Sequence, residues 1–297
     1  LSGISVGGQY ALIAIGYTMV YGILRLINFA HGDVFMVAGL MMVYLSAALP
    51  LYLAVPVVAL LTVALGFVIE KIAYKPLRSA PRMSVMISAI GVSYLLQNLA
   101  LYVTGGLNKT YPTIPWISDQ VDLFGATTKR VTLITPVLTI ILVILLVQLI
   151  NHTKVGMAMR AVAKDFETSQ LMGIKINNVI SVTFIIGSFL AAVGSMLYFS
   201  NYPGVVPTSG AMPGLKAFVA AVFGGIGSIP GAVIGAFIIG VFESLIKGLD
   251  TILTTFHIIQ SPLELSTFSD AFTFVLLIVI LVFKPTGLFG EKATDKV

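Results

Sequence analysis

The sequence predicts an all-α integral membrane protein that crosses the bilayer about eight times, with roughly 20 apolar residues in each crossing. Hydrophobic residues make up 58% of the chain and charged residues 10%, whereas about 25% of residues are charged in an average soluble domain. The apolar runs lack the two-residue alternation of membrane barrel strands, and they exceed the roughly ten residues of such strands. Helices are therefore predicted for every crossing, within a single transmembrane domain over residues 1–297.

The predicted crossings follow the apolar runs in chain order. They cover residues 4–24, 30–49, 53–73, 83–104, 131–150, 179–200, 215–245 and 268–283. The first run is treated as a helix rather than a cleaved leader because no basic residue precedes it. The run 215–245 is longer than one crossing requires.

The positions of lysine and arginine predict the orientation. Basic residues gather in segments 71–82 and 151–177 and in the C-terminal tail, at Lys284, Lys292 and Lys296. These three segments are predicted to be cytoplasmic. Segment 201–214 has no charged residue and segment 248–270 has only acidic ones, so both are predicted to lie outside. The loop 105–130 is also placed outside, despite its basic residues, because single crossings connect it to basic segments on either side. The net charge of +5 is interpreted as this orientation signal rather than as affinity for nucleic acid.

A helix break is predicted inside the long run. If both flanking segments lie outside, residues 215–247 must enter and leave on the same side, as two half-helices or two tilted crossings. The interruption reads GGIGSIPGA over residues 224–232, and glycine and proline at this density break a helix. Discontinuous helices of this kind recur at transport sites.

A second interruption reads RLINFAHGD over residues 25–33. It is either a tight cytoplasmic turn or a re-entrant segment at membrane depth. Asp33 either forms a polar or proton site with His31, or caps a helix that runs from Val34 onward. Arg25 is expected to anchor the cytoplasmic end.

No catalytic or metal chemistry is indicated. The chain has no cysteine, its histidines at 31, 152 and 257 are isolated, and it has no HExxH or GxSxG pattern. The glycine-rich stretch 224–231 lacks the lysine of a phosphate-binding loop. We therefore expect no cofactor in this chain, and if ATP drives the protein, another chain binds it.

The basic segment 151–177 contains a predicted short helix, with Asp165 as its N-cap and Gly173 at its end. Phe166, Leu171 and Met172 supply apolar contacts. Such a helix docks on a partner, lies on the lipid surface or packs against the protein's own helix ends, and the pattern leaves all three open.

Small residues predict close helix packing in two places. Gly231 and Gly235 form a GxxxG pattern, and residues 187–194 are rich in glycine, alanine and serine. Glu243 either lines a pathway or sits at a helix end beside Lys247, four residues further on.

Four stretches of the chain carry a family resemblance. They are YALIAIGYTMVYGILRLINFAHGD at 10–33, TKVGMAMRAVAKDFETSQLMGI at 153–174, AAVFGGIGSIPGAVIGA at 220–236 and FKPTGLFG at 283–290. With them the chain resembles the LivH-type permease subunit of bacterial branched-chain amino-acid ABC transporters. The resemblance covers the whole chain.

The resemblance implies a multi-pass subunit of an importer in the bacterial cytoplasmic (inner) membrane, and not an enzyme. Its implied partners are a second related permease, two cytoplasmic ATPases that hold ATP and magnesium, an external substrate-binding protein and membrane lipid. The implied substrates are leucine, isoleucine, valine or similar apolar amino acids. A permease of the same family for urea, amides or other amino acids, and a proton-coupled transporter or channel, are the alternatives.

The resemblance also implies two sets of site residues. The residues implied to couple the permease to an ATPase are Thr153, Gly156, Arg160, Ala161, Asp165, Glu167, Gly173 and Ile174. Met157 and Ser169 depart from the family's pattern in this segment. The residues implied to line the translocation path are Asn28, His31, Gly32, Asp33, Gly224, Gly225, Gly227, Ser228 and Gly231.

Overall fold

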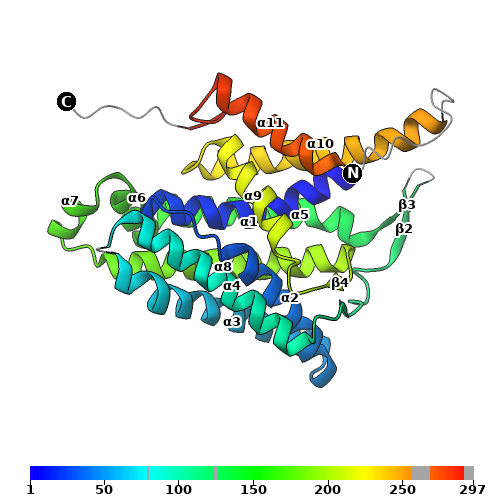
Figure 1. Cartoon of the computed structure of the whole chain (residues 1–297), viewed down its shortest axis with the longest axis horizontal. Helices are drawn as coiled ribbons and strands as arrows, with labels where there is room; N and C mark the ends of the chain where they lie inside the picture. Colours follow the sequence, from blue (N-terminus) through cyan, green and yellow to red (C-terminus); the bar gives the residue numbers. More distant parts are fainter. Residues whose placement is uncertain (79, 124–125, 256–267, 291–297) are drawn as a thin grey trace.

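The computed structural model describes residues 1–78, 80–123, 126–255 and 268–290. It is an elongated bundle in which most of the long helices run along its long axis (Figure 1). In chain order the helices are α1 Ser2–Leu24, α2 His31–Ala48, α3 Leu51–Ile69, the π-helical turn η1 Glu70–Tyr74, the 3-10 turn η2 Lys75–Leu77, α4 Arg82–Thr104, α5 Arg130–His152, α6 Lys154–Lys164, α7 Phe166–Leu171, α8 Ile176–Asn201, α9 Ala211–Gly224, α10 Ile229–Thr255 and α11 Ser269–Phe283. The prediction of an all-α membrane protein is confirmed.

Every predicted apolar run corresponds to helix. Within the described residues, 7 helices are long and apolar enough to cross a membrane, and α9 and α11 are shorter apolar helices. The run 215–245 forms two helices, α9 and α10, separated where the glycine-rich interruption was predicted. The chain is therefore a multi-pass membrane protein with a discontinuous helix.

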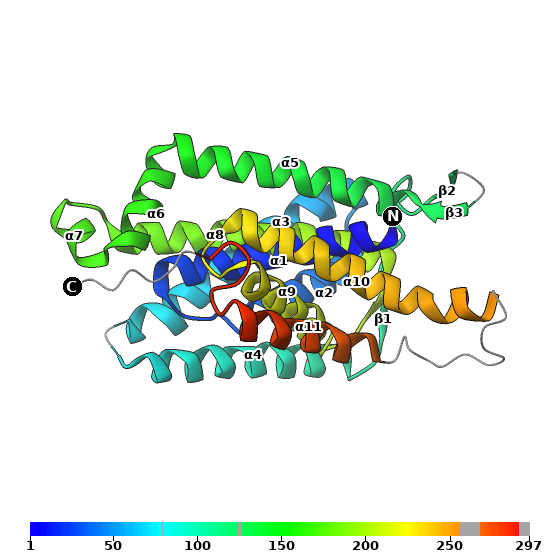
Figure 2. The ribbon, with the colours of Figure 1, turned by 90° about the horizontal axis from the view of Figure 1, so that it is seen from above.

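Helix α1 forms the centre of the bundle. In its most apolar window 89% of the residues are buried inside the protein, against 17% for α5. Figure 2 shows α1 between α5 on one side and α4 on the other. An added Cβ at Gly3 would lie 2.8 Å from the Cα of Val241, and one at Gly7 would lie 2.7 Å from the Cα of Phe237. These glycines let α1 and α10 approach to backbone contact.

The two ends of the bundle differ (Figure 1). One end, called the basic end here, carries α6, α7 and the bend between η2 and α4. The opposite end carries two short antiparallel pairs, β1 Lys109–Thr110 with β4 Gly204–Val205 and β2 Gln120–Leu123 with β3 Ala126–Lys129. The β1–β4 pair places the loop after α4 and the loop after α8 at the same end, as their shared predicted side requires. Some of the predicted loop and tail positions lie outside the described residues. They are residues 256–267, which include His257, and the tail residues Lys292 and Lys296.

Candidate translocation path and coupling segment

Residues 25–30 connect α1 to α2 and turn back into the bundle. α1 ends at Leu24, where Arg25 takes a left-handed backbone conformation with φ 55°. The chain then turns back into the bundle, and His31 packs against Gly16, where an added Cβ would overlap the imidazole ring. Gly16 lies eight residues before the end of α1, or about 12 Å along the helix axis. His31 therefore lies beside the middle of α1 and not beyond its end, and residues 25–30 are called the re-entrant segment because they return into the bundle.

The polar residues of this segment are held by neighbouring helices. Asn28 is buried and accepts a hydrogen bond of 2.7 Å from the Tyr74 hydroxyl. The Asp33 carboxylate accepts hydrogen bonds from the Ser93 hydroxyl and from the Gln97 amide, the latter at 2.9 Å. The prediction of Asp33 as an N-cap is wrong, because α2 already begins at His31 and Ala30 is its N-cap. The Asp33 side chain instead connects α2 to α4.

His31 does not share these contacts. Its ring packs edge-on against Tyr17 with 5.1 Å between ring centroids. Its Nε2 is buried without a hydrogen-bond partner among the described residues. His31 thus faces α1 whereas Asp33 faces α4, so the structure shows no hydrogen bond or ion pair between them in the described part of the chain.

The second break is a tight turn between α9 and α10. Gly225 and Gly227 have φ values of 108° and 100°, which side chains rarely adopt. The Ser228 hydroxyl accepts a hydrogen bond of 3.2 Å from the Gly231 N–H at the start of α10. An added Cβ at Gly224 would overlap the carbonyl of Gly231, so the predicted small-residue packing is confirmed here.

The C-terminal segment docks on this turn. The N–H groups of Leu288 and Phe289 donate 2.9 Å hydrogen bonds to the carbonyls of Phe223 and Gly224. The last carbonyls of a helix have no intrahelical partner, and these bonds satisfy two of them in α9. Two of the stretches that carry the family resemblance, 220–236 and 283–290, therefore form one structural unit.

The two broken segments line one small cavity, called the constriction here. Ile27 of the first segment and Ile226 of the second line one cavity with Tyr17, Tyr21 and Phe218, and its volume is about 10 Å³. Such a cavity holds at most a single water molecule. If substrate passes here, the path is closed in this conformation.

The start of α9 also contacts the first broken segment. An added Cβ at Gly32 would lie 2.7 Å from the carbonyl oxygen of Gly210 and 3.1 Å from the Cα of Gly214. The residues predicted to line a path thus form two groups, one contacting the beginning of α9 and the other forming the turn at its end.

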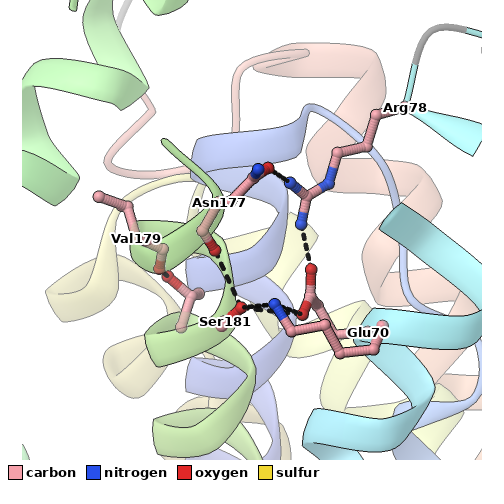
Figure 3. A network of polar contacts seen from close by, with 7 residues as sticks. Glu70, Arg78, Asn177, Val179 and Ser181 are labelled. Carbon is pink, nitrogen blue, oxygen red and sulfur yellow. Dashed lines mark hydrogen bonds and ion pairs between the residues drawn. The ribbon is translucent and has the colours of Figure 1, made fainter. Parts of the chain in front are cut away.

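A buried polar network lies at the basic end (Figure 3). Glu70, in the π-helical turn, has a fully buried side chain that accepts hydrogen bonds from Arg78 and, at 2.9 Å, from Ser181 of α8. The guanidinium of Arg78 also donates to Asn177 of α8. Lys71 Nζ lies 3.4 Å from Glu70. Partial burial lowers the pKa of Arg78, although the Glu70 carboxylate opposes the shift. This network was not predicted, although Glu70 and Lys71 at the end of an apolar run were a signal for it.

The basic segment 151–177, called the coupling segment here after the role that the resemblance implies, contains two capped helices rather than the one predicted. Asp165 is the N-cap of α7, as predicted, and accepts a hydrogen bond of 3.1 Å from the Thr168 N–H. Gly173 follows α7 with φ 81°. Helix α6, which was not predicted separately, is capped by Thr153, whose hydroxyl accepts a 3.0 Å hydrogen bond from Gly156 N–H.

The other implied coupling residues support the shape of this segment. Gly156 is required because an added Cβ would overlap Ile150. Arg160 donates to the Asn151 carbonyl at 3.2 Å, and the Ile174 N–H donates to the Ser169 carbonyl at 3.1 Å. The remaining two lie within the segment: Ala161, whose carbonyl accepts from the Asp165 N–H at 3.0 Å, and Glu167, which is exposed in the first turn of α7.

Arg25 connects this segment to the bundle. Its guanidinium donates a hydrogen bond of 3.3 Å to the Ala163 carbonyl in α6. Leu171 and Met172 are 88% and 78% exposed. The segment is thus tied to the end of α1 and presents apolar side chains away from the bundle.

A charged cluster lies between α9, α10 and α11. Glu243 is 2% exposed, and its carboxylate contacts Lys216, Lys247 and the Tyr10 hydroxyl. Lys216 Nζ also lies 2.6 Å from Asp270. The predicted contact with Lys247 is confirmed, but the predicted helix end is wrong, because α10 continues to Thr255. Glu243 is an acidic residue in the middle of a membrane helix.

Comparisons with known proteins identify the family. The family model described as branched-chain amino acid transport system / permease component matches residues 1–281. The high-affinity branched-chain amino acid permease LivH of Salmonella typhimurium is 39% identical, covering 100% of this chain and 96% of LivH. The corresponding BraD of Pseudomonas aeruginosa is 38% identical over the same shares. The ribose import permease RbsC of Haemophilus influenzae is 28% identical, covering 81% of this chain and 74% of RbsC.

A match over nearly the whole chain, together with the bundle of apolar helices, agrees with the resemblance described from the sequence. This chain belongs to the family of permease components of branched-chain amino acid ABC transport systems.

Proposed function

We propose that this chain is one of the membrane-spanning subunits of an ATP-driven importer, and that it moves branched-chain or similar apolar amino acids inward across the bacterial cytoplasmic membrane. Support for this substrate class comes from the identity of 39% to LivH over the whole chain, against 28% to the ribose permease over 81% of it. Urea, amides and other amino acids are the alternative substrates. An uptake assay that compares them with leucine in the assembled transporter decides between these classes.

The observation that carries the proposal is the coupling segment. α6 and α7 project from the basic end (Figure 1), are fixed by caps at Thr153 and Asp165, and expose Leu171 and Met172. Apolar side chains of this size on a basic surface fit a protein partner. Because Arg25 joins α6 to the end of α1 and to the re-entrant segment, a movement of the segment by an ATPase would reach the path.

The path is proposed to run along the broken segments. The turn after α9 and the re-entrant segment 25–30 have backbone groups outside helices, and helix ends carry partial charges that can meet the ammonium and carboxylate groups of an amino acid. Transport requires the constriction between Ile27 and Ile226 to widen. We propose that this happens when two related permease subunits move against each other, with substrate supplied by an external binding protein.

A tagged copy of the chain, purified from its native membrane in mild detergent, tests the assembly. Recovery of two ATPases and a second permease is expected. Leu171→Asp is expected to lose the ATPases without loss of folded permease, whereas Leu107→Asp, at a 64% exposed position at the opposite end, keeps them. Transport by the isolated chain in liposomes without ATP would contradict the proposal and favour a secondary transporter or channel.

A further inference from the structure

A cleft at the basic end is not accounted for by the proposed path or by docking of an ATPase. Its volume is about 230 Å³, and it lies between the last residues of α1, Leu26 of the re-entrant segment, Tyr74 and Arg78 of the bend, Val85 of α4 and Phe166 of α7. An apolar cavity of about 150 Å³ is known to bind benzene. The cleft therefore has room for a molecule the size of leucine.

The re-entrant segment separates this cleft from the constriction. Leu26 lines the cleft, whereas its neighbour Ile27 lines the small cavity that it shares with Ile226. The backbone of residues 26–27 therefore lies between the two cavities, and a molecule can pass from one to the other only if this segment moves. Arg78 and Phe166 belong to segments that are predicted to be cytoplasmic, so the cleft lies on that side of the constriction.

Arg78 gives the cleft a site for an anion. Its guanidinium is held by Glu70 and Asn177, while its Nε is buried and has no hydrogen-bond partner among the described residues. Two cations, Arg78 and Lys71, share the single Glu70 carboxylate, so this network carries one net positive charge. An arginine that lines the cleft and carries uncompensated charge suits a carboxylate, and its Nε can donate to that carboxylate once the side chain turns toward the cleft.

The remaining walls match the other groups of an amino acid. Leu26, Val85 and Phe166 provide an apolar surface. Ile23 and Leu24 belong to the last turn of α1, where backbone carbonyls lack intrahelical partners and the helix carries partial negative charge. That end favours an ammonium group. One cleft thus offers separate surfaces to the carboxylate, the ammonium and the side chain of an apolar amino acid.

We propose that this cleft is the exit site of the permease: it holds the transported amino acid on the cytoplasmic side, with the carboxylate on Arg78 and the side chain against Leu26, Val85 and Phe166. The proposal rests on the proposed function. Phe166 belongs to α7 of the coupling segment, so movement of that segment by an ATPase would open or close this site. Release of substrate would thereby be linked to the ATPase cycle.

The chain has no cysteine, so a single introduced cysteine can be labelled selectively. Leu26→Cys, a half-buried position in the cleft, is introduced into the complete transporter, with Leu24→Cys as a second reporter in case the first does not fold. Inside-out vesicles are treated with a membrane-impermeant thiol reagent, and labelling is measured on this chain alone. Ser84→Cys, next to Val85 and similarly half-buried but outside the cleft lining, is the matched control.

Leucine is expected to slow labelling of Leu26→Cys by on the order of tenfold at about ten times its dissociation constant, by mass action. Labelling of Ser84→Cys stays unchanged. Leucinol, which lacks the carboxylate, gives little protection, and Arg78→Gln abolishes protection by leucine. Asn177→Ala removes one of the two partners of the guanidinium but keeps its positive charge and its ion pair with Glu70, so protection by leucine is expected to remain.

Equal labelling of Leu26→Cys and Leu24→Cys with and without leucine, in a transporter that takes up leucine, would overturn the exit site and leave the proposed function standing. Equal protection by leucine and leucinol would also overturn it, because Arg78 would then have no role in recognition. A transporter that takes up no branched-chain amino acid contradicts the proposed function itself, and the exit site with it.

Discussion

Lys216 of α9 and Glu243 of α10 form an ion pair inside the bundle, with 2.8 Å between Nζ and Oε1. Their side chains are 7% and 3% exposed. Ionised groups within a membrane protein are costly unless they are paired. Lys247 and Asp270 complete the cluster with one more charge of each sign, so its net charge is zero. The cluster joins both halves of the discontinuous helix to α11.

Lys216→Met is therefore expected to destabilise the protein by about 3 kcal/mol, because Glu243 and Asp270 lose their shared cation. The double variant Lys216→Met with Glu243→Leu is expected to recover part of this loss. Thermal unfolding in detergent, followed by size-exclusion chromatography, measures both. Additive losses in the double variant would show that the two residues contribute independently.

The close contact between Gly16 and His31 leads to a second prediction about stability. Gly16→Ala forces the imidazole ring away from α1, and overpacking of this kind costs about 1–3 kcal/mol. Gly22→Ala, in the same helix, meets nothing within 4 Å and is expected to be neutral or to stabilise by up to about 1 kcal/mol. The melting temperatures of the two variants provide the comparison, and equal values would contradict the re-entrant packing of His31.

The helix positions could be predicted because the bilayer requires long apolar runs, and every such run in the described chain became helix. The breaks could be predicted because clustered glycine and proline interrupt helices, as around Gly225. The cap at Asp165 is likewise local in sequence. The depth of residues 25–30 could not be predicted, since it depends on the Gly16–His31 contact between separate helices.

Long-range charge pairs escaped prediction for the same reason. Lys216 and Glu243 are 27 residues apart, and nothing in local periodicity brings them together. Their presence within a single apolar run was nevertheless a signal, because an unpaired charge there would be expensive. The start of α6 was missed because its cap, Thr153, directly follows α5 without a loop.

Substitutions at Gly225 and Gly227 test two reasons for glycine in this turn, backbone strain and close packing. Gly227 has φ 100° but open space around it, whereas an added Cβ at Gly225 would also overlap the backbone of Gly290. Gly227→Ala is expected to cost about 1–3 kcal/mol from strain alone. Gly225→Ala is expected to cost more and to release the C-terminal segment from α9. Limited proteolysis near Leu288 reports that release, and equal protection in both variants would contradict the docking.

Bulky substitutions at Gly225 or Gly227 are also expected to reduce transport, because the proposed path runs along this turn. Normal transport in such variants would contradict that path.

Variants of Asp33 test whether its carboxylate positions helices or carries a proton. Its carboxylate accepts hydrogen bonds from Ser93 and Gln97 of α4. Asp33→Asn keeps the shape and one acceptor, so we expect near-normal ATP-driven uptake with an unchanged pH profile. Asp33→Leu removes both acceptors and leaves the half-buried Gln97 amide only its 3.4 Å hydrogen bond to Ser93, so it is expected to lose about 2 kcal/mol of stability. Uptake measured across a range of pH in the assembled transporter tests this. If Asp33→Asn folds normally but loses uptake or its dependence on pH, Asp33 carries a proton during transport, and the carboxylate does more than hold α2 against α4.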